Sequence, residues 1–155
     1  MQHLRAICLL VLALLAGCGT QRRAAAPVVS PGDALAPGKD QVWQLVALRG
    51  REVSRTSNVI TLVVNPEAGL ASGNGPCNSY GASAQLKYTA TMPDGDHYAV
   101  KFSNLTSTDT RCPDSELGAE ARHTALLASA DAMVLTATTL TLLCRDKEVL
   151  RYELR

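Results

Sequence analysis

The sequence predicts a mainly β fold of the α+β class: a curled antiparallel sheet, partly open and barrel-like, with one helix inserted before the last strands. Two observations indicate this fold. Short segments of apolar and β-branched residues recur from residue 42 onward, separated by polar turns. A single segment with helical spacing interrupts them near residue 114. Several short strands with one late helix favour a sheet that curls toward a barrel.

The strands are expected where β-branched or alternating apolar residues lie between turn residues. The segment before residue 65 is β-branched, and the turn Asn65-Pro66 closes it. The clearest hairpin surrounds the turn at residues 93–96, Pro-Asp-Gly-Asp. A loop is expected at residues 73–76, Gly-Asn-Gly-Pro. The expected strands are residues 42–48, 58–64, a short one from 70, 84–92, 98–102, 140–144 and 149–154.

The helix is expected to begin just after Pro113. Asp114 or Ser115 can serve as its N-cap, and Glu116 lies in the first turn, where a negative charge suits the helix dipole. Residues at helical spacing predict the face that packs on the sheet. They are Leu117, Ala121, Thr124 and Ala128, with Leu127 at the edge of the stripe.

A basic start, an apolar run and small residues open the chain. Arg5 precedes the run at residues 6–16, which is shorter than the roughly 20 apolar residues of a membrane-spanning helix. Leu15-Ala16-Gly17-Cys18 then matches a lipobox. We predict that residues 1–17 are a lipoprotein signal peptide and that Cys18 is lipidated; the alternative is an ordinary signal with a chance cysteine. Gly19 in place of Asp favours the outer membrane.

Composition predicts the rest of the organisation. Residues 18–40 carry the lipidated cysteine and a tether of proline, alanine and glycine, with no aromatic residue. Residues 41–155 have the size of one domain. Without residues 1–17 the chain holds 14 basic and 14 acidic residues, so it lacks the basic field that attracts nucleic acid. The expected partners are the membrane, through the lipid, and an envelope protein.

Four stretches of this domain resemble the META domain family, also called HslJ-like. They are Trp43-Gln44-Leu45 with Gly50, the Cys-Asn loop at residues 73–81, the spacing of Thr108 and Cys112, and the helix and strand with Glu120, Leu127 and residues 140–142. The chain departs from the family at Pro76, Asp109 and His123. The resemblance covers nearly all of residues 42–154. It implies a non-enzymatic role, in a family whose members are often lipoproteins linked to envelope stress.

Three cysteines remain after the predicted cleavage, in an oxidising compartment where disulfides persist. Their odd number allows at most one intramolecular pair. Cys77 and Cys112 lie in the two loop signatures of the family, and we interpret them as a disulfide. The alternative is a redox or metal site, although no Cys-x-x-Cys pattern is present. Cys144 ends an apolar strand and is expected to be a buried, inert thiol.

Few residues offer catalytic chemistry, and we predict a chain that is not an enzyme and holds no metal or cofactor. The two remaining histidines, His97 and His123, are expected to be solvated or hydrogen-bonded. Neither a nucleophile elbow nor a phosphate loop occurs. A run of hydroxyl side chains either lines a polar groove or satisfies the backbone of its own loop. The run is Ser103, Thr106, Ser107, Thr108 and Thr110.

Two classes of function stay open. The first is a module anchored at the periplasmic face of the outer membrane, with a non-enzymatic binding or structural role. The second is a carrier that holds a small ligand inside the curled sheet. The chain has one Trp, one Phe and four Tyr. Because apolar ligand pockets usually draw on aromatic side chains, this scarcity favours the first class.

Overall fold

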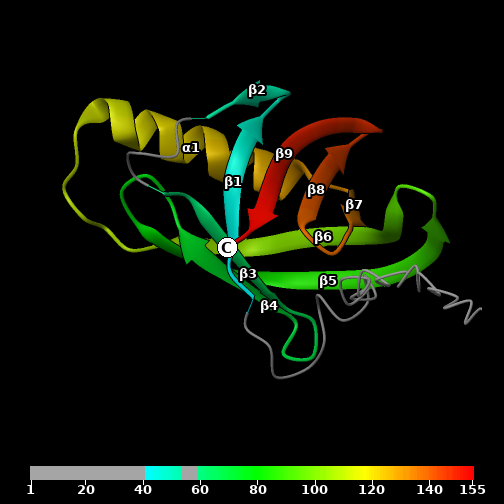
Figure 1. Cartoon of the computed structure of the whole chain (residues 1–155). Coiled ribbons are helices and arrows are strands. Elements are labelled where there is room, and N and C mark those ends of the chain that lie inside the picture. Colours follow the sequence, from blue (N-terminus) through cyan, green and yellow to red (C-terminus); the bar gives the residue numbers. More distant parts are fainter. Residues whose placement is uncertain (1–40, 54–58) are drawn as a thin grey trace, which may run out of the picture.

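The computed structural model describes residues 41–53 and 59–155, which fold into nine strands and one helix (Figure 1). The elements are β1 Trp43–Leu48, β2 Arg51–Glu52, β3 Thr61–Asn65, β4 Leu70–Asn74, β5 Ser79–Met92, β6 Gly95–Ser107, α1 Asp114–Ser129, β7 Ala132–Leu135, β8 Thr139–Cys144 and β9 Lys147–Leu154. The predicted signal peptide, Cys18 and tether lie outside the described residues, as does residue 58, the expected start of the second strand.

Eight of the described strands form a closed antiparallel ring. The order is β1-β3-β4-β5-β6-β7-β8-β9, and β9 pairs again with β1, while β2 pairs only with β1. Across the closing pair Trp43 lies opposite Leu154. The predicted mainly β antiparallel fold with one late helix is confirmed. The ring is closed, whereas we expected a partly open sheet. The closing pair joins the two ends of the domain, so no local sequence pattern reveals it.

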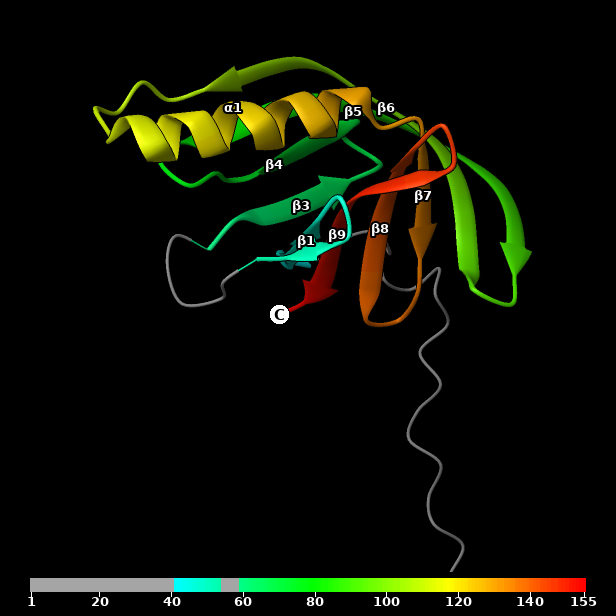
Figure 2. The same ribbon diagram turned by 90° about the horizontal axis from the view of Figure 1, so that it is seen from above.

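Strands β5 and β6 form a hairpin of 14 and 13 residues. It contains the predicted hairpin but begins earlier, at Ser79, and ends later, at Ser107. Its turn requires glycine: Gly95 has φ 138°, and a Cβ there would lie 2.5 Å from the carbonyl oxygen of Leu135. The predicted loop at residues 73–76 is wrong for its first half, which extends β4. Since β4 has only 5 residues, the outer part of the hairpin projects past it (Figures 1 and 2).

Helix α1 begins at the expected residue but is neither capped nor oriented as predicted. Pro113 occupies the N-cap position, and no side chain caps the helix. The predicted packing face is wrong, because Leu117 is 41% exposed. The buried residues are Glu120, His123, Leu126 and Leu127. Two polar side chains therefore face inward, since both find hydrogen-bond partners on neighbouring segments.

One hydrophobic core joins the strands to α1. Trp43, Met133 and Tyr152 are completely buried, from three different strands. Met133 belongs to β7, a strand that is not among those expected from the sequence. Its four residues follow directly on the helix and are too few to show a strand period clearly. The large side chain of Trp43 points inward, as an amphipathic first strand predicts.

Candidate functional site

A buried carboxylate connects α1 to the loop between β4 and β5. Glu120 is 8% exposed. It accepts hydrogen bonds from the backbone N–H groups of Cys77 at 3.2 Å and Asn78 at 2.7 Å, and from Asn78 Nδ2 at 3.0 Å. A carboxylate is costly to bury unless such donors compensate the loss of water. The three bonds therefore hold this loop in a fixed position against the helix.

Asn78 extends the connection to the segment that precedes α1. Its Oδ1 accepts hydrogen bonds from Thr108 Oγ1 at 2.9 Å and from the Thr110 N–H at 2.8 Å. A disulfide joins Cys77 to Cys112, with Cα atoms 6.2 Å apart. We refer to Glu120, Asn78 and this disulfide as the loop clamp. The sequence pattern predicts no contact for Glu120, although this residue lies in the helix stretch that resembles the family.

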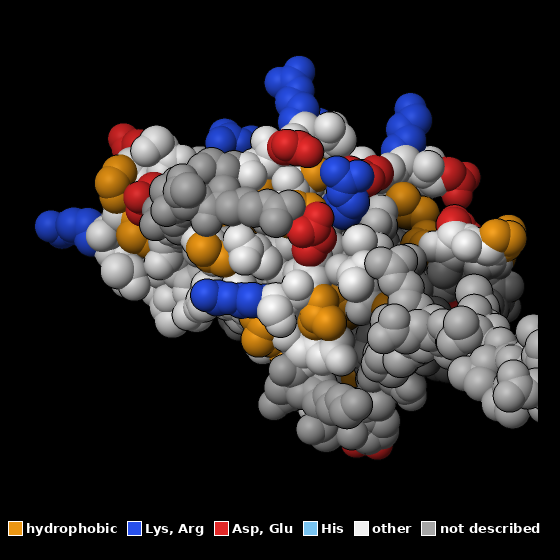
Figure 3. Space-filling model, in the orientation of Figure 1, with side chains coloured by type: hydrophobic (Ala, Val, Ile, Leu, Met, Phe, Trp, Pro, Cys, Tyr) orange, Lys and Arg blue, Asp and Glu red, His pale blue; other side chains and the backbone are white. Residues whose placement is uncertain are grey.

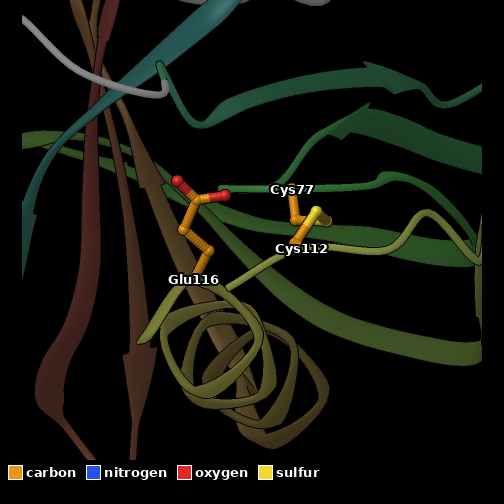
Figure 4. Close-up of side chains that lie close together, drawn as sticks. All are labelled: Cys77, Cys112 and Glu116. Atoms are coloured by element: carbon orange, nitrogen blue, oxygen red, sulfur yellow. A yellow bond between two sulfur atoms is a disulfide. The ribbon is translucent and has the colours of Figure 1, made fainter. Parts of the chain in front are cut away.

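Glu116 lies in the first turn of α1, next to the disulfide (Figure 4). Ligand atoms of Cys77, Cys112 and Glu116 lie within 4.8 Å of one another. Metals bind the thiolate form of cysteine, so the closed disulfide withdraws both sulfurs from such a role. Cys144 is a free cysteine at the end of β8. It packs against the core as expected for a thiol that ends an apolar strand, but it is half-buried where the sequence predicts a buried thiol.

His123 lies at the centre of a buried ring cluster. Its Nε2 is 2.9 Å from the hydroxyl of Tyr152, and its ring centroid is 5.4 Å from that of Tyr80. Burial lowers the pKa of His123 to about 4, opposed by the nearby charge of Glu120. Burial also raises the pKa of both tyrosines. At neutral pH these shifts keep the three rings uncharged, and all three rings are buried.

The remaining candidates lie apart from this cluster. His97 Nε2 is 2.9 Å from Asp94 Oδ1 beside the β5–β6 turn, and this hydrogen bond lowers the pKa of Asp94. The hydroxyl run is divided between two settings. Residues 103–107 belong to strand β6 and not to a loop, whereas Thr108 follows the strand and donates a hydrogen bond to Asn78 of the loop clamp.

A groove of about 420 Å³ lies between α1 and the start of the sheet. Apolar side chains of β1 and the adjoining segments form much of it, including Leu45, Leu48 and Ile60, and Ala119 contributes from the helix. Charged residues of both signs border it, namely Arg51, Glu52, Glu116 and Arg122. Figure 3 shows basic and acidic side chains interspersed on the face drawn, without a field of one sign.

Comparisons with known proteins identify the fold through two solved structures and the family through one family model. A search of the curated proteins gives no match. Two solved structures resemble the chain, both determined by NMR. One has a TM-score of 0.54 and 20% identity, and the match covers 81% of this chain and 95% of that protein. The other, from Burkholderia xenovorans, has a TM-score of 0.53 and 20% identity, and the match covers 88% of this chain and 96% of that protein. The family model of the META domain matches residues 34–155, and the chain therefore belongs to the META domain family.

Proposed function

We propose that this chain is a lipid-anchored envelope lipoprotein that acts as a non-enzymatic binding module. Its signal-like start and its lipobox at Cys18 support the anchor, and its membership of the META domain family supports a non-enzymatic role in the envelope. Among the described residues, no helix combines the length and apolar character needed to cross a membrane. In this proposal a segment of an envelope protein occupies the groove between α1 and β1.

The observation that carries this proposal is the filled interior. Trp43, Leu62 and Tyr152 are each 0% exposed within one continuous core. A small ligand inside the ring would have to displace such side chains, and emptying a core position costs about 2–5 kcal/mol. The binding surface is therefore sought on the outside of the ring, which makes the carrier the weaker alternative.

The groove suits a polypeptide better than a small apolar molecule. The half-buried side chains of Leu48 and Ile60 offer apolar contact, while Arg51 and Glu52 border the groove with opposite charges. Protein interfaces combine an apolar centre with a polar rim in this way. Arg122 and Glu116 continue the mixed rim on the helix side.

Site-specific photo-crosslinking in intact cells tests the groove. A photo-reactive residue replaces Ser115, an exposed groove residue, or Lys147, an exposed residue that does not line the groove. We expect an adduct with one envelope protein from position 115 only. Ala119→Arg places a large side chain in the groove and should abolish this adduct. Equal adducts from both positions, or an adduct that survives Ala119→Arg, would contradict docking in the groove.

Metabolic labelling tests the anchor separately. The wild-type chain should incorporate radioactive fatty acid, and Cys18→Ser should remove both the label and the cleavage at this site. A label that persists in Cys18→Ser would exclude this cysteine as the lipidated residue. Native mass spectrometry of the purified protein addresses the carrier: a tightly bound small molecule would favour it over the module.

A further inference from the structure

Where strand β5 extends past β4, its edge is not paired with any of the described strands. The two strands pair only from Ser79 to Ser83, and the last backbone bond runs from the Ala84 N–H to the Gly69 carbonyl at 2.8 Å. Beyond this bond, no strand of the described part of the chain pairs with that side of β5. The views in Figures 1 and 2 both show this half of the hairpin extending away from β4. The ring of described strands is thus closed, yet within that part of the chain β5 keeps an open edge.

The direction of the backbone groups along this edge follows from the register. The Ala84 N–H points toward β4, and residues two apart on a strand point to the same side. Leu86 and Tyr88 therefore direct their N–H and C=O groups outward. The register of β6 is consistent with this direction. Leu86 lies opposite Val100, and the Val100 N–H points away from β5 and donates a hydrogen bond to the Asp131 carbonyl. A bulge follows Tyr88 and ends the regular run.

Each face of the edge has its own chemistry. On the face that continues the core, Leu86 is half-buried and Tyr88 is 54% exposed, with its ring 5.7 Å from that of Tyr98. Lys87 lies on the opposite face, as does Lys101, which lies opposite Gln85 on β6. Both lysines are exposed, and neither forms an ion pair with another described residue.

We propose that the open edge of β5 binds an extended segment of another protein, which adds to the sheet as an antiparallel or parallel strand. Main-chain hydrogen bonds to Leu86 and Tyr88 hold the segment, its apolar side chains cover Tyr88, and its acidic side chains face Lys87 and Lys101. Strand addition of this kind takes affinity from the backbone and specificity from alternate side chains. The inference adds a second surface to the proposed module and does not depend on the groove.

The charge on the edge favours a foreign segment over a second copy of this chain. Two copies paired about a twofold axis at Lys87 would place the two lysines directly opposite each other, an unfavourable cross-strand pair. Lys87 and the bulge also protect the edge from indiscriminate pairing, as charges and bulges do on other edge strands. An acidic segment turns the same lysine into an attractive contact.

Peptide binding to the whole chain in detergent tests the proposal. The probe is a fluorescent ten-residue peptide that alternates valine and glutamate, and the control peptide alternates valine and lysine. Fluorescence anisotropy should show binding of the glutamate peptide only. In its presence, hydrogen exchange at the Leu86 and Tyr88 amides should slow. Failure of the glutamate peptide to bind, or equal binding of both peptides, would overturn the proposal.

Charge reversal supplies the decisive variant. Lys87→Glu should weaken binding of the glutamate peptide about fivefold, the effect of one cross-strand charge pair, and should allow the lysine peptide to bind. Lys147→Glu is the matched control, because Lys147 is an exposed lysine on β9. This variant should change the affinity for neither peptide. An equal loss of peptide affinity in both variants would show that the edge of β5 is not the binding site.

Ala119→Arg should leave peptide binding intact, so failure of the groove and failure of the edge are distinguishable. A dimer that forms through this edge in sedimentation would show that a second copy is the occupant and would refute the foreign segment.

Discussion

Replacing Glu120 by alanine should destabilise the domain more than any other single loss of charge on α1. Three donors would lose their acceptor: the N–H groups of Cys77 and Asn78 and the amide of Asn78. An unsatisfied buried donor costs about 1–3 kcal/mol. The Cys77 bond is the longest and only part-buried, so it adds least. We expect a total loss of about 3–5 kcal/mol, a large share of the roughly 5–15 kcal/mol that stabilises a domain.

Urea unfolding followed by the fluorescence of Trp43 measures this loss. The midpoint should fall with an unchanged slope, since the folded core stays the same. Glu120→Gln retains one acceptor oxygen but turns an amide toward donors, so it should lose about half as much. Glu67→Ala is the matched control, because Glu67 is exposed in the turn after β3 and should lose less than about 0.5 kcal/mol. A loss for Glu120→Ala as small as that of the control would refute the clamp.

Three further predictions concern the disulfide, the buried histidine and the first strand. Peptide mapping without reduction should link Cys77 to Cys112, and reduction should cost about 3–4 kcal/mol of unfolding free energy by the loop-entropy estimate. Because folding lowers the pKa of His123 from 6.5 to about 4, the unfolded chain binds the proton more tightly. Stability should therefore fall by up to about 3 kcal/mol between pH 6.5 and 4, and a large part of that fall should vanish in His123→Gln when unfolding curves are compared. Trp43→Ala should cost about 3–5 kcal/mol, whereas deletion of residues 20–39 should leave the melting temperature nearly unchanged.

Local patterns predicted most of the strands, because alternation and turn residues act over a few positions. They did not predict the closure of the ring, since the Trp43–Leu154 pair depends on residues at opposite ends of the domain. Strand β7 was missed because four residues after a helix give too short a period. The ends of the long hairpin were missed for a related reason: glycine and serine near Gly81 resemble a loop, yet they pair with β4 and β6.

The helix face shows why the candidate site was harder to predict than the fold. Apolar spacing places Leu117 inside and leaves Glu120 and His123 without a role, but the structure does the opposite. Each polar residue is buried because a distant segment supplies its partner: Asn78 for the carboxylate and Tyr152 for the imidazole. Periodicity weighs each residue by its own polarity, so it misplaces a polar residue whose hydrogen-bond partner lies elsewhere in the chain.

Both proposed surfaces arise where neighbouring strands fail to match. In a ring of equal strands every edge is paired, and a filled interior leaves no internal site. Here β5 has 14 residues and its neighbour β4 has 5, so the open edge follows from their difference in length. Strand β2 pairs only with β1, outside the ring, and its residues Arg51 and Glu52 border the groove. Extending β4 along β5 would satisfy the backbone of Leu86 and Tyr88 internally. Such a redesigned chain should keep its fold and its groove but lose the affinity for the acidic peptide, which separates the role of the edge from the stability of the sheet.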